Sequence, residues 1–320
     1  MFDLKPFFMV LLIVTSANAE DATSFVEKLK EHSKQMMPIQ YDVELSSSVK
    51  PRFDNMEDSL KYWTKRMNYS VSQKRRGGKN IKPSESDLKA IIEKNASSFV
   101  TGCTSTMYQK CKSFDSHNYL LEIIDGESNT TIQMMMSDEV LQYAFDPECN
   151  NLALNPPSPY TREMLSLFEH ERAYNFINKG LRIETKGDDI YLYVSMYNEK
   201  DNYIMKFKKG DIGFPFEIVN NNSKGHINYY YSGFRMIDGI KFPTQIKVEQ
   251  YNHHEVTNKL CLRYVMIQTF TNIKIDKSLK KDDIDFMVPP DTSVHNYSNK
   301  DAFKISNSKE SVSVKKSIKR

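Results

Sequence analysis

The most constraining feature of this sequence is a run of strand-like segments joined by very short connections. From Leu181 onward, apolar and polar residues alternate in segments separated by turns such as KGDD, NEKDN, NNNSKG and DG. Alternation with a period of two is typical of β-strands with one buried face. Because a parallel pair needs a crossover of about a dozen residues or more, such short connections predict antiparallel neighbours. The second half of the chain is therefore predicted to be a long meander.

The clearest hairpin of this meander lies between Ile227 and Tyr251. Its Asp238-Gly239 pair is typical of a two-residue type I′ turn. Pairing across this turn sets the side chains of one largely apolar face opposite each other, in the pairs Tyr229 and Val248, Tyr231 and Ile246, Arg235 and Phe242, and Ile237 and Ile240. Arg235 is expected to point inward on this face, where a cation needs a carboxylate, a carbonyl or a ligand headgroup as its partner.

Helices are predicted in the first half of the chain. A helix from Asp21 to Met37 presents Phe25, Leu29, Ser33 and Met36 at helical spacing and ends at Pro38. Residues 39–45 then alternate as a first strand. A helical insertion is expected at about residues 50–112, with a stripe of Met56, Leu60, Trp63 and Met67 on its first helix and a second helix that begins near Ser84. Thr161 begins another helix, which extends to about Asn178.

The predicted fold class is α+β, mainly β. The first strand, short strands near residues 119–145 and the meander give a sheet of about ten strands, which cannot stay flat because twist accumulates. The sheet is expected to curl into an incomplete β-barrel. Its apolar concave face must then be shielded from water by other elements. The helices are the available cover, so we expect them to lie across the open side.

The two ends of the chain are expected to lie outside the folded domain. Residues 1–19 have a basic start, an apolar stretch and an Ala-Asn-Ala site, which predicts a signal peptide cleaved after Ala19. No later apolar run is long enough to span a membrane, so we expect a periplasmic or secreted protein. Residues 20–298 are predicted to form one domain. Residues 299–320 hold seven basic and two acidic residues and are predicted to be a disordered tail.

The four cysteines leave several possibilities open. Export permits disulfides, and three pairings of Cys103, Cys111, Cys149 and Cys261 are possible. A local Cys103–Cys111 bond would leave Cys149 to pair with Cys261. The alternative is that some of them are buried as small hydrophobic residues. Since none forms a C-x-x-C motif, neither a zinc site nor a redox site is indicated.

No catalytic motif is present. The chain has no G-x-S-x-G, P-loop, Rossmann glycine pattern or H-E-x-x-H. His253 and His254 are predicted to lie in the outer turn of the hairpin, and His170 on a polar helix face. We therefore predict neither an enzyme nor a bound metal or cofactor. The remaining enzymatic hypothesis is a hydrolase whose active site brings together residues distant in sequence, such as His170 or His253 with carboxylates. The net charge of +3 comes from the tail, which argues against a nucleic-acid binder.

Two segments resemble a known family. Tyr231 to Val248, YSGFRMIDGIKFPTQIKV, and Thr271 to Val294, TNIKIDKSLKKDDIDFMVPPDTSV, are similar to hairpin and C-terminal patterns of the outer-membrane lipoprotein-sorting carriers of the Gram-negative periplasm. Asp291 stands where that family's pattern has glycine. The resemblance implies an incomplete antiparallel barrel with helices across its open side. It also implies that the apolar space between sheet and helices holds acyl chains.

Two functional hypotheses follow. The first is a non-enzymatic, monomeric carrier or binder of lipid or of an acylated protein, with an envelope protein as a transient partner and no nucleic acid. The expected wall of its apolar cavity consists of Tyr229, Tyr231, Arg235, Phe242, Ile246 and Val248 from the sheet, with Leu60 and Trp63 from a lid helix. All of these residues are equally consistent with a packed core. The second hypothesis is a structural or interaction protein of the cell envelope, whose helices fill the concave face.

Overall fold

The part of the chain that can be described covers most of the protein. The computed structural model describes residues 22–53, 55–74, 85–115, 117–156, 167–168, 170–171, 180–195, 202–211, 213–222, 225–254, 258–297, 301–305 and 310–318. The predicted signal peptide and most of the predicted helix at 161–178 lie outside these residues.

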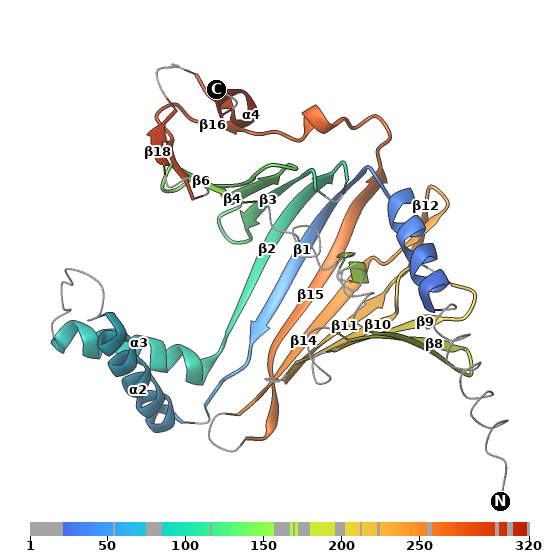
Figure 1. Cartoon of the computed structure of the whole chain (residues 1–320). Helices are drawn as coiled ribbons and strands as arrows, with labels where there is room; N and C mark the ends of the chain where they lie inside the picture. Colours follow the sequence, from blue (N-terminus) through green and yellow to red (C-terminus); the bar gives the residue numbers. More distant parts are fainter. Residues whose placement is uncertain are drawn as a thin grey trace, which may run out of the picture.

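Fifteen strands form one open, twisted sheet with β18 and β7 at its edges (Figure 1). In order from the centre, the first wing consists of β2 (Cys103–Ser113), β3 (Tyr119–Asp125), β4 (Thr131–Ser137), β5 (Gln142–Asp146), β6 (Asn151–Asn155), β17 (Ser293–Asn296) and β18 (Asp301–Lys304). The second wing consists of β15 (Leu260–Ile275), β14 (Gln245–His253), β11 (Gly225–Ser232), β10 (Glu217–Asn222), β9 (Asn202–Lys208), β8 (Asp189–Ser195) and β7 (Leu181–Lys186).

The predicted fold class is confirmed, with two differences. The sheet is open, mainly antiparallel and larger than the expected ~10 strands. Among its described strands, β6 and β17 pair in parallel, which short-range alternation could not predict. The C-terminal segment, which the sequence patterns left without strands, supplies β17 and β18.

The first strand of the chain lies at the centre of the sheet. β1 (Ile39–Val49) pairs antiparallel with β2 on one side and with β15 on the other. Its predicted alternation is confirmed, because Ile39, Tyr41, Val43 and Leu45 are buried and the residues between them are more exposed. β1 therefore joins two wings that are far apart in the sequence.

The N-terminal helix (residues 22–35) covers the second wing. Its predicted inward stripe is confirmed, because Phe25, Leu29 and Met36 are all buried against the sheet. The ring of Phe25 meets that of Phe207 on β9 edge to face, with 5.1 Å between centroids. In Figure 1 this helix crosses in front of the second-wing strands. The covered face of the second wing is thus a packed core.

A second core lies on the opposite face of the first wing. Met136 of β4, Tyr143 of β5 and Leu154 of β6 stand opposite one another and point to this face. Described residues between Leu279 and Ile318 pack against them, including residues of β16 (Met287–Val288), β19 (Val312–Ser313) and α4 (Val314–Ile318). The prediction of a disordered tail is therefore wrong for the described part of residues 299–320. Val314, for example, is 0% exposed in this core. The few apolar residues of the segment are therefore enough to cover a neighbouring sheet face.

The helical insertion does not cover the sheet. α2 (Met56–Lys74) and α3 (Glu85–Thr101) pack against each other, where the Ser59 hydroxyl donates to the Ala96 carbonyl at 2.9 Å. In Figure 1 they lie beyond the ends of β1 and β2. Because Val49 pairs with Cys103, the insertion leaves the sheet at this end and continues away from it. The expectation that α2 serves as a lid is wrong.

The predicted hairpin is confirmed in register but is interrupted. Tyr229 pairs with Val248 and Tyr231 with Ile246, as expected. Beyond them, β12 (Arg235–Ile237) and β13 (Ile240–Phe242) form a separate ribbon.

The interruption has a local cause. Gly233 has a φ of 65° and Pro243 has no amide hydrogen, so the ladder cannot continue through these positions. The alternation of faces is lost at this break. Arg235 is therefore exposed although it stands opposite Phe242, which is buried, and the expectation that Arg235 points inward is wrong.

Candidate functional site: an apolar cleft on the first wing

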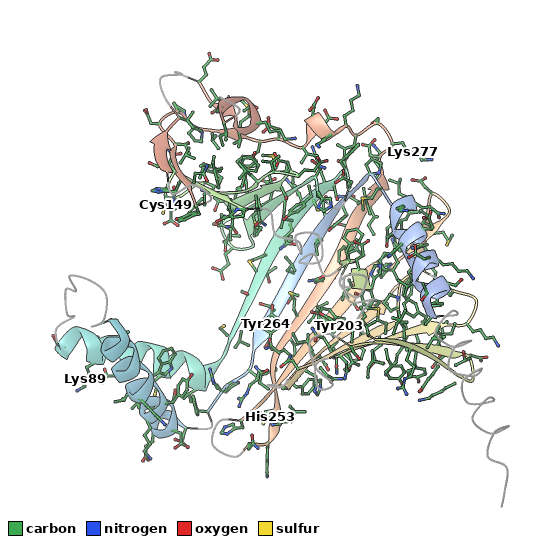
Figure 2. The ribbon with its side chains drawn as sticks, viewed as in Figure 1. Lys89, Cys149, Tyr203, His253, Tyr264 and Lys277 are labelled. Atoms are coloured by element: carbon green, nitrogen blue, oxygen red, sulfur yellow. The ribbon has the colours of Figure 1, made fainter. Side chains whose placement is uncertain are left out.

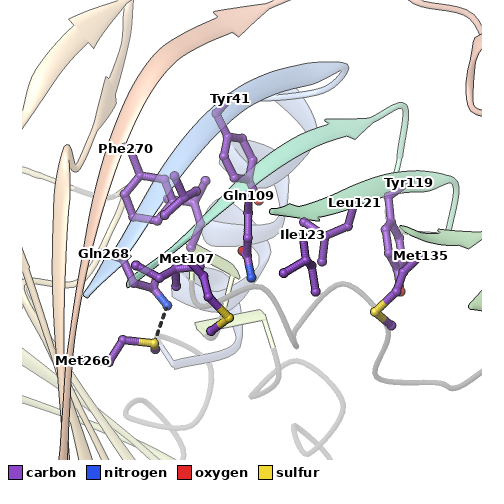
Figure 3. A pocket seen from close by; sticks show the side chains of 13 residues that line it. Tyr41, Met107, Gln109, Tyr119, Leu121, Ile123, Met135, Met266, Gln268 and Phe270 are labelled. Carbon is purple, nitrogen blue, oxygen red and sulfur yellow. Dashed lines mark hydrogen bonds between the residues drawn. The ribbon is translucent and has the colours of Figure 1, made fainter. Parts of the chain in front are cut away.

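An apolar cleft lies on the face of β1 and the first wing that neither the N-terminal helix nor the C-terminal segment covers. Its volume is about 270 Å³. The lining side chains come from β1, β2, β3, β4, β15 and a short turn at residues 167–168, and they are Tyr41, Val43, Leu45, Met107, Gln109, Tyr119, Leu121, Ile123, Met135, Leu167, Met266, Gln268 and Phe270 (Figure 3).

The sheet register explains why these side chains meet. Residues directly opposite on neighbouring strands share a face. One such row contains Phe270, Val43, Gln109 and Ile123, on β15, β1, β2 and β3 in turn. The adjacent rows bring in the other sheet residues of the lining. The floor of the cleft is therefore fixed by the pairing of β1 with strands on both sides.

The cleft and the packed core share one continuous sheet face. The row Tyr231, Ile246, Gln268, Leu45 and Met107 runs from β11 to β2 without changing sides. Its first two residues belong to the core, and its last three line the cleft. The cleft is the part of this apolar face that the helix leaves uncovered.

No acidic residue, lysine, arginine or histidine is among the thirteen lining side chains. The polar groups are two carboxamides, Gln109 and Gln268, and two phenols, Tyr41 and Tyr119. Gln142 donates to the Tyr119 hydroxyl oxygen at 3.2 Å, but burial is the larger effect and raises the pKa of this phenol. Tyr119 therefore stays neutral at physiological pH.

The residues that the sequence indicated as a cavity wall lie beside the cleft. Tyr229, Tyr231, Phe242, Ile246 and Val248 are buried in the core of the second wing, and none of them lines the cleft. The ring of Phe214 lies 5.7 Å from Phe242 and 6.3 Å from Tyr231, between centroids, and helps to fill the space above them.

The two residues expected from a lid helix are farther away. Leu60 and Trp63 are half-buried on α2, where the Trp63 ring contacts Tyr62 with 5.8 Å between centroids. They do not line the cleft with the sheet residues, because α2 lies beyond the end of the sheet (Figure 1).

The sequence does contain a signal for the cleft, which the pattern analysis missed. Gln109 and Gln268 each stand at an inward position of an alternating strand, between apolar inward neighbours. A lone amide at such a position is unusual in a fully packed core, because a buried amide needs hydrogen-bond partners.

The cysteines are all free thiols. Cys103 and Cys111 lie on the same extended strand, eight residues apart, which is ~26 Å and far beyond disulfide reach. Cys149 follows β5 at one end of the molecule, whereas Cys261 pairs with Asn252, next to His253, at the other end (Figure 2). The expected pairings Cys103–Cys111 and Cys149–Cys261 are therefore wrong for this structure.

The histidines lie apart from the cleft lining. His170 is buried against the ring of Phe214, with centroids 5.3 Å apart, and His253 is exposed with its Nδ1 3.1 Å from the carbonyl oxygen of Asn258. Within the described ranges, no group of three or more potential metal ligands comes together. A search of the same ranges finds no helix with the length and apolarity to cross a membrane.

Three solved structures align with most of the chain at low sequence identity. A LolA-superfamily protein from Nitrosomonas europaea is 12% identical over 82% of this chain and 96% of its own, with a TM-score of 0.46. A putative outer membrane lipoprotein-sorting protein domain from Vibrio parahaemolyticus is 10% identical over 83% and 97%, with a TM-score of 0.47. A DUF1329 family protein from Desulfovibrio piger is 12% identical over 81% and 95%, with a TM-score of 0.43.

The first two of these structures are described as a LolA-superfamily protein and a putative outer membrane lipoprotein-sorting protein domain. No protein-family model matches the chain, and no curated protein matches it significantly.

Proposed function

We propose that this protein is a non-enzymatic carrier or binder of lipid or acyl chains, which lie in the cleft of the first wing. The observation that carries the proposal is a cleft whose described lining is uncharged and mainly apolar, on a sheet face that the N-terminal helix covers elsewhere. Its volume of about 270 Å³ lies just below the ~300–1,000 Å³ typical of ligand pockets, which suits one slender chain. Each buried methylene would add ~0.8 kcal/mol of affinity.

The proposal includes a location and a partner. The predicted signal peptide at residues 1–19 supports a periplasmic or secreted protein, and N-terminal sequencing of the exported protein should then begin at Glu20. An envelope protein would deliver or receive the ligand transiently, and the carrier itself would act as a monomer. The alternative, an envelope structural protein without a ligand, requires a filled face, and the cleft favours the binding role over it.

Fluorescence of the hydrocarbon probe diphenylhexatriene, which rises in apolar surroundings, tests the proposal on the purified protein. Two neighbouring residues of β15 provide a matched pair of variants. Met266 lines the cleft, and Ile267 is exposed on the opposite face. Met266→Trp should weaken probe binding by about tenfold or more, which corresponds to ~1.4 kcal/mol, because the indole fills the cleft. Ile267→Trp should leave binding unchanged.

Two results would overturn the proposed function. One is a wild-type protein that does not enhance probe fluorescence. The other is equal probe binding by the Met266→Trp and Ile267→Trp proteins when circular dichroism shows that both are folded.

A further inference from the structure

The two ends of the cleft differ in burial. Along β1, the lining residues extend from Tyr41 to Leu45. The inward residue before Tyr41 is Ile39, which is 0% exposed, whereas the second inward residue after Leu45 is Val49, which is 41% exposed. The cleft therefore has a buried end near Ile39 and an exposed end near Val49.

The neighbouring strand β2 shows the same gradient. Its inward residues change from buried at Cys111, through half-buried at Met107, to exposed at Cys103. Because β2 pairs with β1 in continuous register, the exposed ends of the two strands lie side by side. This is the end at which α2 and α3 leave the sheet (Figure 1). An amphipathic ligand is favoured with its chain at the buried end and its polar head at the exposed end, because burial of a polar head is costly.

Three hydroxyl groups stand at the exposed end and form what is here called the hydroxyl cluster, made of Ser47, Ser105 and Tyr264. Ser47 of β1 pairs with Ser105 of β2, with 2.8 Å between their hydroxyl oxygens. Tyr264 of β15 is hydrogen-bonded to the Ser47 side chain. The next inward pair along β1 and β2 is Leu45 and Met107, and both line the cleft. The hydroxyl cluster thus borders the apolar floor directly.

The hydroxyl cluster can both donate and accept hydrogen bonds. Each hydroxyl has one hydrogen and two lone pairs. The contacts of Ser47 with Ser105 and with Tyr264 use two of the three hydrogens, so one hydrogen and further lone pairs remain for water or a ligand. Burial raises the pKa of Tyr264, and the hydrogen bond with Ser47 opposes this shift only in part, so the phenol keeps its hydrogen at neutral pH. A ligand hydroxyl, which also donates and accepts, is complementary to this cluster.

We infer that the ligand lies along β1 with its acyl chain toward Tyr41 and a hydroxyl-bearing head, such as glycerol, at the hydroxyl cluster. The cluster thereby favours acylglycerols over acyl esters whose heads carry no hydroxyl. This inference rests on the proposed function, because it specifies the ligand of the same cleft and the direction in which it lies.

Displacement of bound diphenylhexatriene by monodecanoylglycerol and by methyl decanoate tests the inference, because the two compounds share one acyl ester and differ in the head. The wild type should require an about fivefold lower concentration of the glycerol ester, the equivalent of one hydrogen bond. Ser47→Ala, Ser105→Ala and Tyr264→Phe should each reduce or abolish this preference. Displacement by methyl decanoate and binding of the hydrocarbon probe should be unchanged.

Ser46→Ala is the matched control, since Ser46 is the preceding residue of β1, is exposed and points to the opposite face. It should keep the wild-type preference. Equal displacement of the probe by both esters in the wild type would overturn the inference. So would a preference that persists in all three variants of the hydroxyl cluster, or one that Ser46→Ala removes as well. A wild-type protein that binds no probe would instead overturn the proposed function and this inference together.

Discussion

The same apolar sheet face is packed differently on the two wings. On the second wing, the N-terminal helix presses Phe25 and Leu29 against the strands, and the face becomes a core. On β1 and the first wing, the face continues in register, and among the described residues it carries only the turn at residues 167–168 and forms a cleft. Alternation therefore determines which side of a strand is apolar, whereas the cover determines whether that side is a core or a binding surface.

The C-terminal segment sharpens this comparison. It packs against the first wing, but on the face opposite the cleft. The first wing is thus stabilised on the face opposite the cleft, while the cleft face is covered neither by the N-terminal helix nor by this segment. This arrangement allows a binding surface to be exposed without loss of the strands that form it.

The largest effect is expected for Phe207→Ala on the covered face of the second wing. Phe207 is 0% exposed and its ring contacts Phe25. Removal of a fully buried aromatic ring should lower the free energy of unfolding by ~3–5 kcal/mol. Urea titration followed by circular dichroism measures this change. A loss under ~1 kcal/mol would contradict a packed core beneath the helix.

Val314→Ala should give the next largest effect, because Val314, the first residue of α4, is buried in the core on the face of the first wing opposite the cleft. The expected loss is about 2 kcal/mol. Substitution of the neighbouring exposed Ser311 by alanine serves as the control and should change little. If Val314→Ala had no effect on the urea midpoint, residues 312–318 would not be part of the second core.

A smaller effect is expected for Met135→Ala in the cleft. Met135 is half-buried and already borders open space, so its truncation creates little new cavity. The loss in unfolding free energy should be about 1 kcal/mol or less. Diphenylhexatriene binding should weaken more clearly than stability. A destabilisation as large as that of Phe207→Ala would show that the two wings do not differ as described.

The smallest effect is expected from His32 on the N-terminal helix. Burial lowers the pKa of His32, and the nearby Asp211 carboxylate opposes this shift only in part. The unfolded chain then binds the proton more readily, so this histidine favours folding fully above its unfolded pKa of ~6.5 and less as the pH falls below it.

Urea midpoints of the wild type and His32→Gln between pH 7.5 and 5.5 measure this contribution. The wild type should lose more stability on acidification than the variant. An identical pH dependence of the two proteins would contradict the effect of burial at the helix cover.

Local features of the fold could be read from the sequence. The faces of Ile39–Leu45, the Asp238-Gly239 turn and the pairing of Tyr231 with Ile246 all follow from period and turn chemistry, and all are confirmed. These features depend on residues that are close in the chain. The prediction that Arg235 points inward is wrong for a reason that is also local, because Gly233 interrupts the hydrogen-bond ladder between Arg235 and the sheet.

Long-range features could not be read in this way. Nothing in the alternation of β1 indicates that Ile39 pairs with Ile275, or that Val314 covers the back of β5. The cleft depends on these placements, because it lies on the part of the apolar face that the N-terminal helix does not cover. The predicted wall at Tyr229 and Val248 lies on the correct face, but the helix that covers it could not be located from periodicity.

The central place of β1 has a consequence for how the chain folds. β1 is made early, but its partner β15 follows more than 200 residues later, as the pairing of Ile39 with Ile275 shows. Until then, one edge of β1 presents unpaired amides and carbonyls, and such edges are prone to pair with other chains. Contacts so distant in sequence also slow folding. Completion of the sheet must therefore wait for nearly the whole chain, and the nascent protein depends on protection of that edge in the meantime.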